Sequence, residues 1–302
     1  MSFLLATRGS NLAMWQADTA TGLLRTAHPD WEVAPHVVHS SGDVDLSTEL
    51  AAFGRTGIFT VEIDLAVLKG DARVGVHSLK DMTTVLHDEL CLAGVMARGP
   101  VEDVMVGASL DDLPQGATVA TGSRRRQAML LHARPDLEIV GMRGNVETRL
   151  SKIAEGHARA TVMARAGLMR LGYDEHIAQV LSREHFVPAP GQGIVGLVCK
   201  KDDEEARRAL FGITDLDAWA AALCERAFLR ELEGGCSAPI GGHARVRENT
   251  IALHGRVLAP DGSEMMEEHQ SGSTDDPEAL GVRAARALLD RGAGELLARA
   301  RD

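Results

Sequence analysis

The sequence is poor in aromatic residues, which make up 3% of its 302 residues and include one tyrosine. Surfaces that bind nucleic acids need positive charge and often aromatic rings, and the net charge here is −11. No run of 18 apolar residues occurs, so no membrane-spanning helix is expected. The four cysteines are scattered without a CxxC pair, which argues against disulfides or a metal site and favours a cytoplasmic location. These absences predict a protein without nucleic-acid or membrane partners.

Short β-type runs alternate with amphipathic helical patterns along most of the chain, which is typical of α/β layers. Strands are expected at 3–7, 33–39, 73–77, 118–121, 138–141, 160–164 and 194–199, with helices at 10–27, 60–69, 123–133, 146–155 and 216–233. Ser10 and Asn145 are expected N-caps. The rest reads as a small α+β unit, with strands near 243–246 and 250–258 and a helix from Pro277. We predict two α/β domains linked by a crossover.

Basic residues are concentrated in one stretch of this acidic chain. Residues 121–170 contain ten basic and four acidic side chains, and nine of the ten are arginines. Arg124, Arg125 and Arg126 open a predicted helix, where positive charge opposes the helix dipole unless an anion is bound nearby. Arg143 and Gly144, at the next turn from strand to helix, repeat this arrangement, with Arg149 one turn later. The stretch could be a solvated helical face, but several arginines on such turns predict a ligand with several carboxylates or phosphates.

Two further residues have side chains suited to catalysis. Asp81 follows a β run in VHSLKD; it is either a surface partner of Lys80 or a carboxylate that stabilises a developing cation. Cys236, in LEGGCSAPIG, lies in a glycine-rich loop where a thiolate could reach a small electrophile. Arg8 and Ser10, at the first turn from strand to helix, could bind an anion or simply cap the helix.

Nine strings in this order resemble the porphobilinogen deaminase family across almost the whole chain. They are ATRGSNLAMWQA, SSGDVDL, VHSLKDM, TGSRRRQ, MRGNVETRL, RAGLMRLG, PAPGQGIVG, ERAFLRELEGGCSAPIG and LAPDGSEM. The resemblance implies an α/β fold class with two doubly wound, periplasmic-binding-protein-like domains and a smaller α+β C-terminal domain. It implies domain 1 at 1–98 and 194–213, domain 2 at 99–193 and domain 3 at 214–302.

The resemblance also implies an activity. Four porphobilinogen molecules would be joined, with loss of ammonia through an electrophilic azafulvene, into the linear tetrapyrrole hydroxymethylbilane. The primer would be one dipyrromethane cofactor per chain, made from substrate and held by a thioether bond to Cys236. Asp81 would be the catalytic carboxylate. The resemblance thus implies a cytoplasmic, monomeric transferase of tetrapyrrole (heme) biosynthesis, whose partner is a small anionic pyrrole.

The same resemblance assigns further site residues. Besides Cys236, the positions implied to bind the cofactor are Asp43, Ser78, Lys80, Thr121, Ser123, Arg125, Arg126, Arg143 and Gly144. The positions implied to bind substrate are Arg8, Ser10, Arg149, Arg170 and Gln192. No metal ligand is implied.

The chain departs from the family pattern in the loop that usually carries lysines. Ala52, Thr56 and Val61 stand where lysines are usual, although Arg55 is adjacent. Gly122 and Ser123 replace a serine pair, Arg124 replaces a leucine, and Thr83 and Thr84 follow VHSLKDM where prolines are usual. Two alternatives therefore stay open: a diverged paralogue that acts on a modified pyrrole, and a non-catalytic protein that binds polycarboxylates.

Overall fold

The computed structural model describes residues 2–38, 60–233 and 238–300. The chain divides into two compact units. The first comprises Met1–Arg98 and Ile194–Trp219, and the second comprises Gly99–Gly193 and Ala220–Asp302. Among the described helices, none combines the length and the hydropathy needed to cross a membrane.

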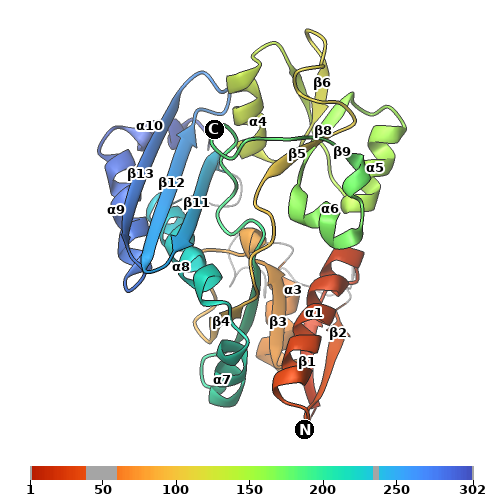
Figure 1. Cartoon of the computed structure of the whole chain (residues 1–302), viewed down its shortest axis with the longest axis vertical. Helices are drawn as coiled ribbons and strands as arrows, with labels where there is room; N and C mark the ends of the chain where they lie inside the picture. The colour runs from red at the N-terminus through yellow and green to blue at the C-terminus, as the bar shows by residue number, and fades with distance from the viewer. Residues whose placement is uncertain (1, 39–59, 234–237, 301–302) are drawn as a thin grey trace. The chain divides into compact units, whose positions relative to one another are not determined.

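The first unit is built on a five-stranded sheet in the order β2-β1-β3-β10-β4 (Figure 1). Its strands are β1 (Ser2–Thr7), β2 (Glu32–Val37), β3 (Val74–Ser78), β4 (Leu90–Val95) and β10 (Val195–Lys200). Its helices are α1 (Asn11–Ala27), α3 (Val61–Lys69), the 3₁₀ turn η1 (Leu79–Asp81) and α7 (Glu204–Gly212). The strands β2, β1 and β3 run parallel, whereas β10 runs antiparallel to β3 and β4. The carboxyl ends of β1 and β3 therefore lie at the same edge.

Both faces of this sheet are covered, which follows from the alternation of side chains along a strand. Phe3 and Leu5 of β1 pack into a core with α1 and α7. Ala6 points to the opposite face and packs against Ile63 and Ala66 of α3. Helices on both faces of a mostly parallel sheet make a doubly wound layer structure.

The second unit contains a similar sheet in the order β7-β6-β8-β5-β9. Its strands are β5 (Asp103–Val106), β6 (Thr118–Ala120), β7 (Glu138–Val140), β8 (Ala160–Ala164) and β9 (Ile177–Val180). Its helices are α4 (Arg124–Ala133), α5 (Val146–Ala154), α6 (Arg165–Leu171) and the 3₁₀ turn η2 (Asp174–His176). The sheet is again covered on both faces: Met105 packs with α4, whereas Val104 and Val106 pack with α5 and α6.

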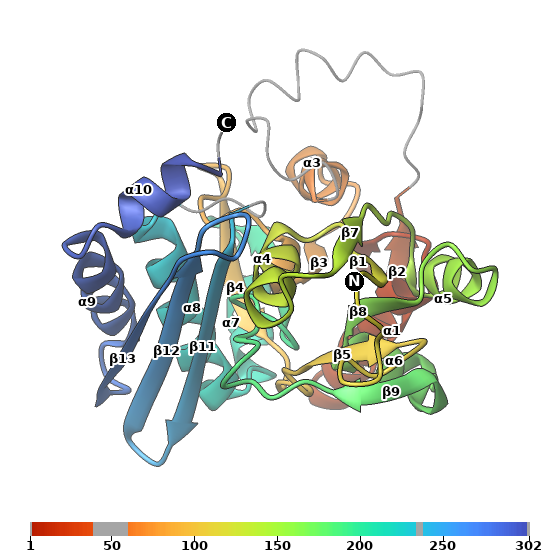
Figure 2. The same ribbon diagram turned by 90° about the horizontal axis from the view of Figure 1, so that it is seen from above.

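The second unit also contains a three-stranded antiparallel sheet in the order β11-β12-β13. Its strands are β11 (Ile240–Arg247), β12 (Thr250–Leu258) and β13 (Met265–Ser273), and its helices are α8 (Leu216–Glu231), α9 (Pro277–Leu289) and α10 (Ala293–Ala298). In Figure 2, α9 lies alongside this sheet. Ile251, Leu253 and Val257 of β12 pack into one core with all three helices. The other face of the sheet carries His254 and the buried Arg256.

The strand orders confirm the predicted fold class of two doubly wound layers and a small α+β part. Most expected helices and strands are present within one or two residues, and Ser10, Ser123 and Asn145 all cap helices. The sequence analysis missed the helices α6 and α7 and the strands β4, β5, β9 and β13. All four missed strands pair only with antiparallel neighbours.

Substitution by alanine is expected to change the stability of the protein in opposite directions at two helical glycines. A Cβ on Gly22 in the exposed middle of α1 meets nothing within 4 Å, so Gly22→Ala should stabilise the protein by about 0.5–1 kcal/mol. A Cβ on Gly281 in α9 would lie 2.2 Å from the backbone oxygen of Cys224 in α8. Gly281→Ala should therefore separate the two helices and destabilise the protein by about 1–3 kcal/mol. Urea denaturation followed by circular dichroism measures both effects. Shifts of the same sign would contradict this account of the α8–α9 contact.

Candidate active site

In the first unit, candidate residues follow the carboxyl ends of β1 and β3. Ser10 caps α1 by accepting a hydrogen bond of 3.4 Å from the Ala13 N–H. Ser78 ends β3, and its hydroxyl accepts a bond of 2.8 Å from the buried Gln16 side chain. Arg8 is exposed at the start of the β1–α1 turn.

The turn η1 positions Lys80 and Asp81. Its first residue, Leu79, is buried, and the Leu79 N–H donates to the Ile194 oxygen over 3.0 Å. This anchor fixes the start of the turn, while Lys80 is half-buried and Asp81 is exposed. A carboxylate on a tight turn beyond a buried strand is well placed to meet a ligand at this edge of the sheet.

In the second unit, candidate residues follow the parallel strands β6, β7 and β8. Ser123 caps α4 and accepts from the Arg126 N–H, while the Thr121 hydroxyl accepts from the Ser123 N–H at 3.2 Å. After β7, the Arg149 side chain donates to the Gly144 oxygen at 2.9 Å. Gly144 has a φ of 127°, and a Cβ there would lie 2.7 Å from Thr148, so this turn requires glycine.

Two further arginines of the second unit differ in their surroundings. Arg143 is exposed. Arg170, on α6, donates to the Gly193 oxygen over 2.7 Å, and burial lowers the pKa of its guanidinium. Arg170 stays charged because an arginine pKa starts far above neutrality.

The side chains of Arg125 and Arg126 lie inside the second unit and are not exposed for direct contact with a ligand. Both are buried, and both bond to Asp103 at the start of β5, with distances of 2.7 Å from Arg125 and 2.8 Å from Arg126. They also donate to the backbone oxygens of Val187 and Val162. The physical reason is that the first turn of α4 packs against β5 and β8, so the two side chains reach a carboxylate inside the unit.

Gln192 joins the same buried network. It is fully buried and donates from Nε2 to the Val101 oxygen at 2.7 Å and to Asp103 at 2.9 Å. Burial raises the pKa of Asp103, but the charges of Arg125 and Arg126 outweigh burial and hold it well below its usual range. Two guanidinium groups and one carboxylate leave this network with one net positive charge at the start of α4. Such a charge favours an anion nearby.

Asp103 was missed by the sequence analysis. The only local signal is an acidic residue at the beginning of the apolar run VMV. Its partners are Arg125, Arg126 and Gln192, which lie at least 22 positions away in the sequence.

The structure also pairs two cysteines that are far apart in the sequence. Cys91 of β4 lies directly opposite Cys199 of β10. A hydrogen bond with Cys199, aided by the cations Arg207 and Lys201, lowers the pKa of the partly exposed Cys91 thiol to about 7. Burial raises the pKa of Cys224 to about 12. Among the described cysteines, Cys91 is therefore the one whose thiol pKa is lowered, and Cys199 and Cys224 are buried as expected.

Several expected site residues lie outside the described residues. These are Asp43, Cys236 and the substituted loop positions Ala52, Arg55 and Thr56. Val61 is described: it begins α3 and is 3% exposed. Valine at this position is thus a core residue of the first unit.

The chain matches two family models. Residues 3–208 match "Porphobilinogen deaminase, dipyromethane cofactor binding domain", and residues 219–290 match "Porphobilinogen deaminase, C-terminal domain". A porphobilinogen deaminase of Syntrophotalea carbinolica is 42% identical over 297 residues, which cover 97% of this chain and 94% of the relative.

Two of the solved structures similar to this chain are binding proteins. A TRAP periplasmic solute binding protein from Desulfovibrio salexigens is 11% identical with a TM-score of 0.44, and covers 74% of each chain. The methionine binding protein MetQ is 15% identical with a TM-score of 0.43, over 74% of this chain and 94% of that one.

The two family models together cover most of the chain, and the bacterial relative matches it almost from end to end. The chain therefore belongs to the porphobilinogen deaminase family, the transferases that join porphobilinogen into hydroxymethylbilane on a dipyrromethane cofactor.

Proposed function

We propose that Asp81 is the catalytic carboxylate of this hydroxymethylbilane synthase and that Cys236 carries the dipyrromethane through a thioether bond. The observation that carries the proposal is the position of Asp81: an exposed carboxylate on a turn anchored by a buried leucine, directly beyond β3. Cys236 is proposed from its place in the LEGGC string.

The donor groups of the second unit fit a cofactor that carries four carboxylates, two on each pyrrole. They include the exposed Arg143, the half-buried Arg149 and Arg170, and the capped N-terminus of α4. The buried network of Arg125, Arg126 and Asp103 adds one net positive charge beneath that N-terminus. Helix N-termini and arginines both favour carboxylates. When bound, the dipyrromethane supplies the free pyrrole carbon to which each incoming substrate is joined.

Asp81 would act electrostatically. When porphobilinogen loses its amine as ammonia, positive charge develops on the pyrrole and its nitrogen. A fixed carboxylate near that nitrogen stabilises the charge and accepts the N–H hydrogen bond. Lys80, next to it on η1, and Ser78, held by Gln16, would orient the pyrroles.

The remaining residues would bind and orient. Roles in binding the cofactor are proposed for Asp43, Ser78, Lys80, Thr121, Ser123, Arg125, Arg126, Arg143 and Gly144, and roles in binding the substrate for Arg8, Ser10, Arg149, Arg170 and Gln192. Because Arg125, Arg126 and Gln192 are buried around Asp103, we propose that they act mainly by charge and by shaping the start of α4. Exposed arginines would make the direct contacts.

We further propose a monomer in the cytoplasm with three domains, at 1–98 with 194–213, at 99–193 and at 214–302. A protein that only bound polycarboxylates would use the arginines but would need neither Asp81 nor Cys236. Val61, which stands where the family usually has a lysine, is buried in the core of the first unit, so this departure does not by itself indicate a modified pyrrole as substrate.

Cys236→Ser should give a folded, inactive protein at its unmodified mass, because serine lacks the thiolate that forms the thioether. Intact-protein mass spectrometry and peptide mapping measure this. Cys91→Ser is the matched control, since Cys91 has the lowered thiol pKa of about 7, and it should keep both adduct and activity. An adduct that persists in Cys236→Ser, or maps to Cys91, would reject the assignment.

Asp81→Asn should keep the fold and the adduct and lose turnover by about 10²–10³, because the amide has the same shape without the charge. Single-turnover kinetics with porphobilinogen measure the effect on the adduct-loaded enzyme. Asp71→Asn, an exposed acid in the loop before β3, is the control and should retain activity. Turnover within a few-fold of the parent would make Asp81 a surface partner of Lys80.

Asp103→Asn should destabilise the protein by about 3–5 kcal/mol, because it leaves two buried guanidinium groups without their counter-charge. Glu278→Gln breaks the ion pair between Glu278 and Arg230, both about half exposed, and should have little effect. Thermal and urea denaturation compare the two. If Asp103→Asn were as mild as Glu278→Gln, the network would not be needed for the fold.

The pH dependence provides a second measurement on the same residue. The folded pKa of Asp103 is held well below its usual range, and an unfolded aspartate titrates near pKa ~3.9. Its stabilising contribution is therefore complete above about pH 4 and is lost as the pH falls toward the folded pKa. The parent protein should lose more stability than Asp103→Asn on acidification below about pH 4.

A further inference from the structure

Two histidines and a glutamate meet on the β12–β13 pair, on the face opposite the helices. His254 lies directly across from His269, and Arg256 lies directly across from Glu267. The Thr274 N–H donates to the Asn249 oxygen across the same two strands. Because hydrogen-bonded and non-hydrogen-bonded pairs alternate, both pairs of interest are of the non-hydrogen-bonded kind, in which side chains approach most closely.

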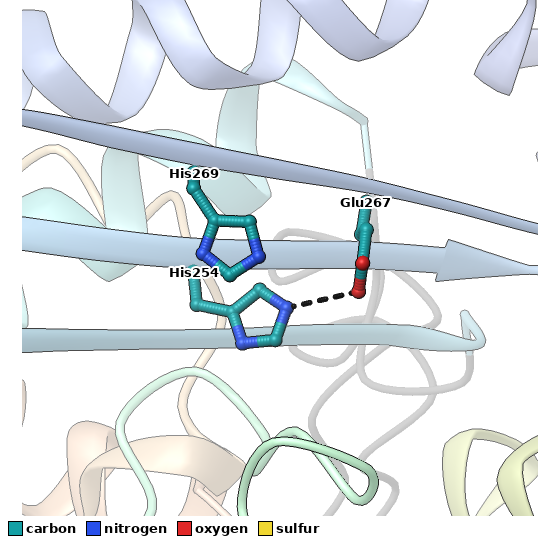
Figure 3. A group of neighbouring side chains, drawn as sticks. All are labelled: His254, Glu267 and His269. Atoms are coloured by element: carbon teal, nitrogen blue, oxygen red, sulfur yellow. Dashed lines mark hydrogen bonds and ion pairs between the residues drawn. The ribbon is translucent and has the colours of Figure 1, made fainter.

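The side chains are close enough to share one ion. The imidazole rings of His254 and His269 stack with centroids 4.0 Å apart. His254 Nε2 lies 3.3 Å from Glu267 Oε2, and one ligand atom from each of the three residues lies within 4.8 Å of the others. Figure 3 shows that each ring presents a nitrogen on the side of Glu267. The ligand atoms of a tetrahedral ion with bonds of about 2.0–2.1 Å are about 3.4 Å apart. The distance of 3.3 Å between His254 Nε2 and Glu267 Oε2 already matches this spacing. Small side-chain rotations would bring a nitrogen of His269 to the same distance from both.

The ligand types suit a transition-metal ion: two imidazoles and one carboxylate lie on one face of the sheet within 4.8 Å of one another. Neutral imidazole and carboxylate together match ions of the zinc class better than Mg²⁺ or Ca²⁺, which prefer oxygen ligands.

Arg256 competes with an ion for the glutamate but does not exclude it. Arg256 Nη2 is 2.5 Å from Glu267 Oε2. The same guanidinium also donates to the backbone oxygens of His185 at 2.6 Å and Glu184 at 2.9 Å. These two carbonyl bonds hold Arg256 in place, so Glu267 can turn toward an ion without leaving the guanidinium unpaired.

We propose that His254, Glu267 and His269 form a binding site for Zn²⁺ or a similar first-row transition-metal ion, open to a water molecule as a fourth ligand. The ion would link β12 to β13 and stabilise the small sheet by binding the folded state. Nothing in the proposed chemistry of Asp81 requires it, so the site is a separate property of the chain.

The test uses the enzyme loaded with its cofactor, stripped of metal with a chelator and treated with iodoacetamide to block exposed thiols. Zn²⁺ is titrated by calorimetry, and Co²⁺ by its visible absorption, at neutral pH. One ion per chain and a raised melting temperature are expected, with no response to Mg²⁺. His254→Gln and His269→Asn should each weaken binding on the order of tenfold or more.

His176→Asn is the matched control, because His176 lies 3.6 Å from Glu175 but has no second imidazole in that contact. It should leave the affinity unchanged. Binding that survives in both His254→Gln and His269→Asn, or no binding of Zn²⁺ to the parent protein at millimolar concentration, would overturn the proposal. Both variants should melt close to the parent protein when no metal is added, so a loss of binding can be separated from a loss of fold.

Discussion

The buried carboxylate of Asp103 holds together the part of the second unit on which ligand binding would depend. It bonds to Arg125 and Arg126 at the start of α4 and to Gln192 in the PGQG turn. Burying three charged groups is unfavourable unless each is paired, and here one carboxylate serves two guanidinium groups. The network therefore fixes the position of α4 and at the same time leaves a positive charge where an anion would be stabilised.

The PGQG turn makes further contacts inside the second unit, and the residue after it, Ile194, makes one inside the first unit. Gly191 donates to the buried Glu225 of α8 at 2.6 Å. The Gly193 oxygen accepts a hydrogen bond of 3.0 Å from the Gly99 N–H of the same unit. The Ile194 oxygen accepts from Leu79, the anchor of the turn that carries Asp81. Gly193 has a φ of 85°, and a Cβ there would lie 2.7 Å from the Gly99 oxygen, which explains why this position has to be glycine.

Many of the helices and the parallel strands could be predicted from the sequence because their signals are local. Ser10, Ser123 and Asn145 are N-caps followed by apolar periodicity, and all three begin helices as expected. The antiparallel strand β5 was not predicted, because its four residues become a strand through pairing with β8 and β9, which are distant in the sequence.

The same limit applies to side chains. The arginine cluster is visible in the sequence, but its division into buried and exposed members is not. Arg125 and Arg126 turn inward because Asp103 is there, and Asp103 is brought there by β5. Likewise, Cys91 and Cys199 are 108 positions apart by their numbering and become neighbours only through the register of β4 and β10. His254 and His269 meet through the register of β12 and β13.

An acidic protein can still bind an anionic substrate because electrostatic interactions in water are local. The net charge is −11, but charges more than about 8 Å apart are largely screened at physiological salt. The arginines that follow β6, β7 and β8 therefore outweigh distant acids for a ligand bound beside them. One of the three charges in the Asp103 network is negative, so Arg125 and Arg126 contribute a single net positive charge. The other arginines would then supply the rest, which would make the exposed Arg143 and the half-buried Arg149 more important for the proposed carboxylate binding than the sequence alone indicates.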